Sequence, residues 1–189
     1  MDRDRFYGLI DAARAGMDPT SPSADPDELR GVLAALESSE LIGFVVAFEE
    51  ELVRLNRWSV WGAGFVSEGG LSDDGFHYFR SWLIGKGRDA VDTVLQDADS
   101  LTDFLDDGDH ENEVMEYVGV HLLEERALKD ARDSGGRPHA DDTPVGDPFD
   151  EETVEAMYPR VAATLDRGTS SRAPRRRGLW SLLRGRSHE

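Results

Sequence analysis

Five residues that can support chemistry lie close together near the middle of the chain, namely Glu68, Asp73, Asp74, His77 and Arg80. Nearby carboxylates favour the charged form of an imidazole, and hard cations bind several oxygen ligands. An arginine can add paired hydrogen bonds to an anionic ligand. The spacing therefore permits acid–base work, metal binding or anion binding in this segment.

A structural interpretation explains the same residues and is the one we favour. Asp73, or the serine before it, lies at a predicted helix start, where its side chain would cap free backbone N–H groups. Asp74 would complement the positive end of the helix dipole, and His77 would face solvent. Arg80 would pair with Asp73 or Glu68 and connect two helices. This interpretation requires no metal and no catalytic residue.

Three of the four tryptophans surround this segment at Trp58, Trp61 and Trp82. Aromatic residues at helical spacing are typical of a core, but an indole N–H needs a partner, which also suits the rim of a groove. Both arrangements remain open. The candidate interaction or ligand residues are therefore Trp58, Trp61, Glu68, Asp73, Asp74, His77, Arg80 and Trp82.

Other patterns that carry chemistry fail at specific positions. The chain has no cysteine, which excludes a thiolate metal site, a disulfide and a cysteine nucleophile. Placing Gly108 at the sixth position of a calcium-binding loop puts Val114 where a ligand is needed. The spacing of Gly62 and Gly64 lacks the residues that follow in a phosphate loop. We expect His121 to be a hydrogen-bonded core residue, and we predict no cofactor and no metal.

The elements that position these residues all have the apolar spacing of helices. An alternation typical of a strand appears only, and weakly, around residues 58–66. We expect Asp25, Ser38 or Ser39, Ser100 and Asp150 to cap helices. The sequence therefore predicts a compact, multi-helix, all-α domain. Helical spacing covers residues 6–14, 29–36, 41–55, 58–66, 76–83, 91–95, 101–105, 111–132 and 154–161.

Composition divides the chain into a helical domain over residues 1–166 and a flexible arginine-rich tail over 167–189. An irregular loop, rich in Gly, Pro and Asp, is expected at 133–149 within the domain. The net charge is −18, yet residues 160–189 carry eight arginines against two acidic residues, a net of +6. The remaining −24 lies on the body, which therefore disfavours nucleic acid and anionic membranes.

The tail combines basic and apolar side chains: Arg175, Arg176, Arg177, Trp180 and Arg184. Each cation near an anionic leaflet contributes about 1 kcal/mol, so this segment resembles a weak interfacial anchor. A disordered end, or a strap lying on the acidic body, are the alternatives. The body has no apolar stretch of the roughly 20 residues that span a bilayer, and its N-terminus does not resemble a signal peptide.

A resemblance to a known family rests on an ordered series of motifs. These are Trp61-Gly62-Ala63, Gly69-Gly70, Ser72-Asp73-Asp74-Gly75-Phe76, Phe79-Arg80-Ser81-Trp82-Leu83-Ile84 and Gly87-Arg88. The series resembles a bacterial family labelled domain of unknown function 4240, over about residues 2–130. The resemblance implies a small, mostly helical, intracellular domain and no particular activity. The tail lies outside it.

We therefore expect a non-enzymatic protein-interaction or regulatory module of a bacterial cytosol, for example of the inhibitor or immunity type. It would present the Trp61–Trp82 hairpin to a protein partner. One alternative is a metal- or anion-dependent enzyme or ligand binder that uses Asp73, Asp74, His77 and Arg80. Another is a peripheral protein that its tail recruits to the inner membrane surface.

Overall fold

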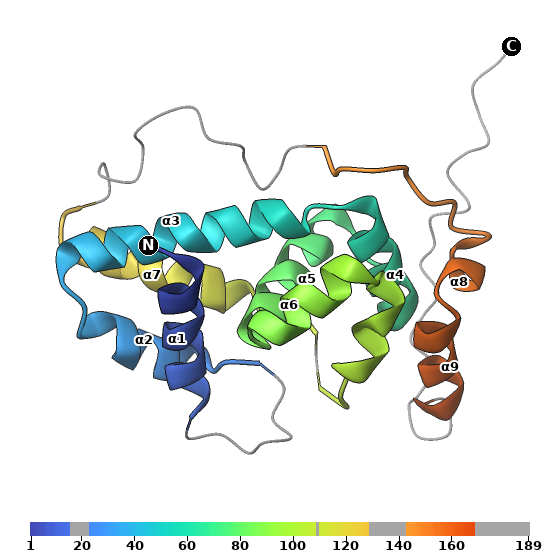
Figure 1. Ribbon diagram of the computed structural model, residues 1–189, viewed down its shortest axis with the longest axis horizontal. Helices are drawn as coiled ribbons and strands as arrows, with labels where there is room; N and C mark the ends of the chain where they lie inside the picture. The colour runs from blue at the N-terminus through green and yellow to red at the C-terminus, as the bar shows by residue number, and fades with distance from the viewer. Residues whose placement is uncertain (16–22, 109, 129–142, 169–189) are drawn as a thin grey trace, which may run out of the picture.

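The computed structural model describes residues 1–15, 23–108, 110–128 and 143–168, with side chains through residue 164 (Figure 1). Every regular element in these ranges is a helix, which confirms the predicted all-α class. The elements are α1 Arg3–Arg14, α2 Pro26–Ala34, α3 Ser38–Leu55, α4 Trp58–Glu68, α5 Asp73–Gly85, α6 Arg88–Gln96, the 3₁₀ helix η1 Ala98–Asp103, α7 Glu113–Glu125, α8 Val154–Met157 and α9 Pro159–Gly168.

The longest helix, α3, runs along one side of the molecule (Figure 1). The helices α1, α2 and α7 gather around its N-terminal half, whereas α4, α5 and α6 lie toward its C-terminal end. The last two helices pack at the far edge, where α9 contacts α4 and η1. One continuous core joins these layers, and its largest fully buried side chains include Trp82, Phe6, Phe44, Phe76 and Phe79.

The predicted cap of α2 is confirmed. Asp25 accepts hydrogen bonds from the backbone N–H groups of Asp27 and Glu28, and Pro26 is the first residue of α2. Gly69, with φ of 67°, ends α4 in the left-handed conformation that glycine adopts without strain. The weak strand alternative for residues 58–66 is therefore wrong.

The cap prediction for α5 is confirmed at Ser72, whose hydroxyl accepts from the backbone N–H of Gly75, whereas the cap predictions for α3 and η1 are wrong by one and three residues. The cap position of α3 is Glu37, which makes no side-chain capping bond, and Ser38 is already helical. Asp97 caps η1 through the backbone N–H of Asp99, so Ser100 lies inside that helix.

The largest error concerns the inward face of α7. The helical spacing over residues 111–132 predicts Val114, Tyr117, Val118, Leu122 and Leu128 on the inward side. The Val114 and Tyr117 side chains are instead 61 % and 39 % exposed, and His121, expected in the core, is exposed as well. The buried stripe instead contains Met115, Val118, Gly119, Leu122 and Leu123. Gly119 permits this rotation, because a Cβ there would lie 2.7 Å from the Val45 side chain of α3.

The predicted last helix is two short helices in the structure. Pro159 has no backbone N–H and so cannot continue α8, and α9 begins there. The predicted cap Asp150 lies three residues before the cap position of α8, Thr153, and accepts from Thr153 and Val154 through its backbone carbonyl. Met157 is 56 % exposed. The division at residue 166 stays a prediction, and the tail after Gly168 lies outside the described residues. None of the described helices combines the length and apolar character that crossing a membrane requires.

Candidate interaction surface

The acidic–histidine cluster predicted from the sequence separates in the structure. Asp73 and Asp74 are exposed in the first turn of α5, where they complement the helix dipole. His77 faces α7 instead, and its Nε2 lies 2.5 Å from a carboxylate oxygen of Glu116. Among the described residues, no group of three or more potential ligands could hold a metal ion.

The hydrogen bonds of His77 define its tautomer. Arg80 has only donors, and its guanidinium lies 3.2 Å from His77 Nδ1, so Nδ1 accepts. The proton is then on Nε2, which donates to Glu116. Both ring nitrogens are therefore engaged within the protein.

Arg80 belongs to the core rather than to a surface pair. Its side chain donates to the backbone carbonyls of Leu52, at 3.1 Å, and Phe76, at 3.4 Å, and it is 3 % exposed. Leu52 lies in the last turn of α3, where a cation complements the negative end of the helix dipole. Glu68 contacts His110, and the pairing of Arg80 with Asp73 or Glu68 stays a prediction.

The first two tryptophans form a stack that crosses from α4 to α5. Trp58 and Trp61 are stacked with ring centroids 5.0 Å apart, and Trp61 stacks on Phe76 at 4.8 Å. Phe149 meets both tryptophans edge-on, at 5.9 and 6.4 Å. The segment that precedes α8 therefore covers this aromatic face, which is only partly accessible to a partner.

Trp82 is fully buried and lies beside the hydrogen-bonded pair of His110 and Glu68. The Trp82 ring lies 4.7 Å from the His110 ring, and His110 Nδ1 lies 2.6 Å from Glu68 Oε1. Lys86 lies over the same tryptophan and binds Asp106 at 2.7 Å. Burial would raise the pKa of Asp106, but the bonds from Lys86 and from a backbone N–H outweigh it and leave that pKa lowered. Trp82 is therefore buried, and Glu68 is only partly exposed.

Sequence reasoning missed a surface that joins α5 to α7. Val114, Tyr117 and His121 form an exposed row three and four residues apart on α7, and the Tyr117 and His121 rings stack at 6.0 Å. Beside them, the Tyr78 hydroxyl donates to Glu113. We call the following residues the α5–α7 face: Asp74, His77, Tyr78, Glu113, Val114, Glu116, Tyr117 and His121.

The acidic members of this face affect the ionisation of Tyr78. Partial loss of water around Tyr78 raises the pKa of its hydroxyl, and the bond to Glu113 and the charges of Glu113 and Asp74 add to the effect. One sequence signal indicated the face. The apolar residues of α7 form two adjacent stripes, more than one buried helix side can hold.

A cavity of about 660 Å³ lies elsewhere, between α1, α6 and the end of η1. None of the candidate residues lines it. Its cations already have partners: Arg14 donates to the Lys86 carbonyl, Lys86 binds Asp106, and Arg88 binds Asp4. We therefore do not assign a ligand to this cavity.

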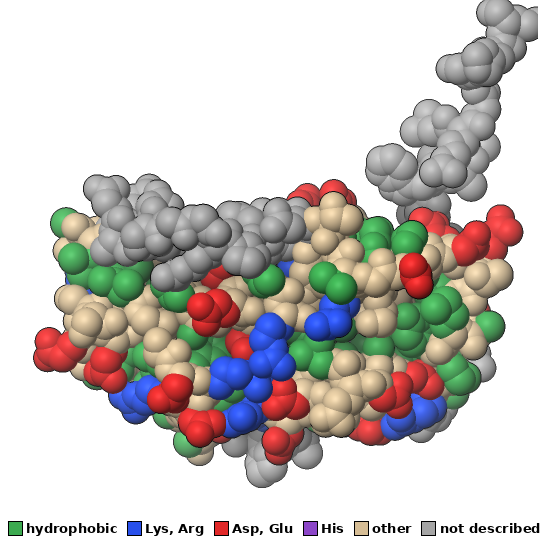
Figure 2. All heavy atoms as spheres, turned by 45° about the horizontal axis from the view of Figure 1, so that its top comes forward, with side chains coloured by type: hydrophobic (Ala, Val, Ile, Leu, Met, Phe, Trp, Pro, Cys, Tyr) green, Lys and Arg blue, Asp and Glu red, His purple; other side chains and the backbone are tan. Residues whose placement is uncertain are grey.

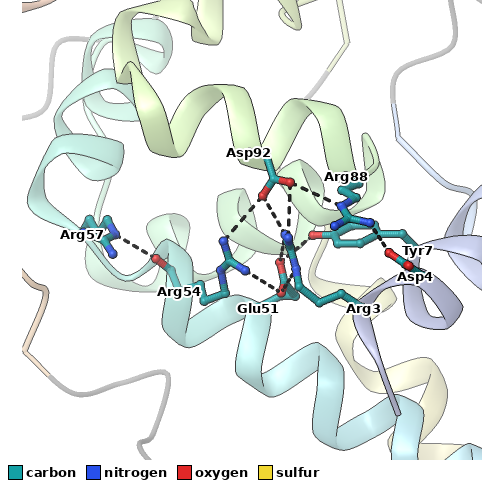
Figure 3. A network of polar contacts seen from close by, with 8 residues as sticks. All are labelled: Arg3, Asp4, Tyr7, Glu51, Arg54, Arg57, Arg88 and Asp92. Atoms are coloured by element: carbon teal, nitrogen blue, oxygen red, sulfur yellow. Dashed lines mark hydrogen bonds and ion pairs between the residues drawn. The ribbon is translucent and has the colours of Figure 1, made fainter.

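A network of ion pairs joins α1, α3 and α6 (Figure 3). Arg3 makes two hydrogen bonds to Glu51, at 2.7 and 3.0 Å, and binds Asp92 at 2.8 Å. Tyr7 donates to the same Glu51, which is 2 % exposed. Arg54 approaches both carboxylates. Figure 2 shows basic side chains gathered among acidic ones on the face that includes α3.

The charges of this network shift the pKa values of its members. Burial, and then the Glu51 carboxylate, raise the pKa of Tyr7, whereas the hydrogen bond from Arg3 lowers that of Asp92 despite its partial burial. Glu51 also holds the pKa of Arg3 above its usual range. Each shift favours the protonation state that fits the ion pairs, so the network holds the three helices together.

Comparison with known proteins identifies the family. A model described as "Protein of unknown function (DUF4240)" matches residues 1–128. No curated protein and no solved structure matches the chain. The matched region includes the ion-pair network and the α5–α7 face, while α8, α9 and the tail follow it. Since this match covers more than half of the sequence, the chain belongs to the DUF4240 family of proteins of unknown function.

Proposed function

We propose that this protein is a non-enzymatic protein-interaction module whose α5–α7 face binds a partner with a basic surface. The observation that carries the proposal is the pair of large side chains, Val114 and Tyr117, exposed one turn apart and bordered by carboxylates. Single exposed apolar residues are ordinary, but a contiguous row with a polar rim is typical of an interaction site.

The chemistry of the face suits recognition of a cationic protein surface. Tyrosines provide large, stiff contact areas and are enriched among residues that dominate binding energy. Asp74 and Glu113 lie at the rim, where complementary charge raises association rates and excludes wrong partners. The net charge of −24 over residues 1–159 extends the same attraction to longer range.

Two observations favour this function over the metal- or anion-dependent enzyme. Asp73 and Asp74 face solvent and do not converge with His77. Arg80 and Glu116 engage both nitrogens of His77, and Arg80 itself is buried. The absence of cysteine suits a reducing compartment, so we place the module in a bacterial cytosol, as a regulator or inhibitor of its partner.

Site-specific crosslinking tests the proposal. A photoreactive phenylalanine analogue replaces Tyr117 in the full-length protein, and the covalent adducts formed in cells are identified by mass spectrometry. The same analogue at Val145, which is as exposed as Val114, is the control. The partner is then purified and its dissociation constant measured.

We expect Val114→Arg to weaken the purified partner's binding at least about tenfold, or about 1.4 kcal/mol, because it places a cation at the centre of the face. Val145→Arg introduces the same side chain at another 61 % exposed valine and should leave affinity unchanged. Equal effects of the two variants, or no adduct specific to position 117, would refute the proposed surface.

A further inference from the structure

We infer that the arginine-rich end of the chain, residues 172–186, binds the α5–α7 face of the same molecule and competes there with a partner. The inference rests on the proposed function, in which this face is the binding surface. It assigns the face a first ligand of known sequence: a basic segment that also carries tryptophan and leucine.

The two surfaces complement each other in both charge and polarity. The segment has six arginines, and its large apolar residues are Leu179, Trp180, Leu182 and Leu183. The face offers the exposed side chains of Val114 and Tyr117 to the apolar residues. Carboxylates at the rim pair with guanidinium groups, and tyrosine rings accept them in cation–π contacts.

The chain is long enough for this contact within one molecule. Trp180 lies twelve positions after the last residue of α9, and at about 3.3 Å per residue this stretch spans about 40 Å when extended. A domain of this size has a radius of gyration of about 15 Å. A tethered segment that reaches the face has an effective concentration of roughly millimolar, so a dissociation constant below this value is enough to fill the face.

The described part of the C-terminal region already binds the body in this way. Arg160 of α9 donates to both carboxylate oxygens of Asp103, at 3.1 and 2.9 Å, and lies 3.4 Å from Asp97. Tyr158 is buried against Gly62 of α4. Arginine–aspartate pairs and aromatic anchors therefore hold residues that follow the matched domain, and the tail repeats both kinds of side chain.

Paramagnetic relaxation in the full-length protein tests the contact directly. The chain has no cysteine, so Ser187→Cys provides a single attachment site for a nitroxide label. We expect amide signals of residues 74–78 and 113–121 to broaden. Val114→Arg should abolish the broadening, whereas Val145→Arg should preserve it. A change of Arg175, Arg176 and Arg177 to Gln weakens the contact without altering the body.

Anionic vesicles containing phosphatidylserine distinguish a docked tail from a membrane anchor. If the tail is docked, Val114→Arg frees it and increases vesicle binding at least threefold, while Val145→Arg has no effect. The inference is overturned if broadening is absent, centres on other helices or persists in Val114→Arg. It is also overturned if all three proteins bind vesicles equally.

The outcomes separate this inference from the proposed function. The triple arginine variant should bind the crosslinked partner more tightly than the wild type does, because a competitor has been weakened. Unchanged partner affinity in that variant overturns the tail contact alone. Partner affinity that does not respond to Val114→Arg overturns the proposed function, whatever the tail does.

Discussion

The ion-pair network around Glu51 and the α5–α7 face contain similar side chains, but the two regions differ in what surrounds their carboxylates. Each combines carboxylates with tyrosine, and each joins elements far apart in the sequence. In the network, each of Arg3, Arg54 and Arg88 faces a carboxylate of the same molecule. On the face, Asp74 and Glu113 border exposed apolar side chains.

The difference shows that residue type alone does not distinguish a structural ion-pair network from a binding surface. A buried carboxylate with donors on every side holds helices together, and removing one member leaves charges without partners. A carboxylate at the rim of an exposed row contributes little to folding and remains available to another molecule. Three comparisons between pairs of positions, and one between a single variant and the wild type, test these arrangements.

The largest effect is expected in the network. Glu51→Ala should lower the free energy of unfolding by about 3–5 kcal/mol, because it leaves Arg3 without its main partner and removes the acceptor of Tyr7. Asp74→Ala on the face should cost only about 0.3–1 kcal/mol, the contribution of an acidic residue in a first helical turn. Urea unfolding of both variants measures the contrast, and similar losses would abolish the distinction.

Two valines one turn apart on α7 give the second comparison. Val118 is 6 % exposed, so Val118→Ala should destabilise the protein by about 1–3 kcal/mol. Val114 is 61 % exposed, and Val114→Ala should change stability by less than about 0.5 kcal/mol. Thermal denaturation of both proteins checks the orientation of α7. A larger loss of stability for Val114→Ala than for Val118→Ala would show that Val114 points into the core, as its spacing in the sequence predicts.

A third pair of substitutions compares the residue that caps α5 with the residue that follows it. Ser72→Ala removes the acceptor for the backbone N–H of Gly75 and should cost about 1 kcal/mol. Asp73→Ala removes only a charge near the helix dipole and should cost a few tenths of a kcal/mol. Chemical denaturation resolves this difference, and the reverse order would return the cap to Asp73.

The smallest effect is a difference in acid sensitivity. Asp92 has a lowered pKa in the folded state, so its stabilising effect is present above its usual pKa, near 4, and is lost as the pH falls through the folded value. Asp92→Asn should therefore flatten the decline in stability below about pH 4. Urea midpoints between pH 2 and 7 measure the two slopes. Parallel slopes would show that Asp92 carries no such linkage.

The sequence predicted most helices and their core because both depend on residues three or four positions apart. Leu41, Val45 and Leu52 define one side of α3 by spacing alone, and all three are buried. The site depends on distant partners instead. The acceptor of His77 is 39 residues away, and the carbonyl bound by Arg80 is 28 residues away.

Local patterns also could not decide between the two stripes of α7. Both have helical spacing, and the choice depends on the close approach of Gly119 to Val45 of α3. The same limit explains why the burial of each tryptophan could not be predicted from its spacing. Trp58 and Trp82 have similar spacing, yet one is half-buried beside Phe149 and the other lies in the core.

The contact between Gly62 and Tyr158 has a consequence for the history of the family. A Cβ at Gly62 would lie 2.7 Å from the tyrosine hydroxyl oxygen and 2.8 Å from its ring, and Tyr158 is only 5 % exposed. Gly62 lies in the family match, whereas Tyr158 follows it. Among relatives, the sizes of these two residues should therefore change together. A relative without this C-terminal extension would be free to replace the glycine.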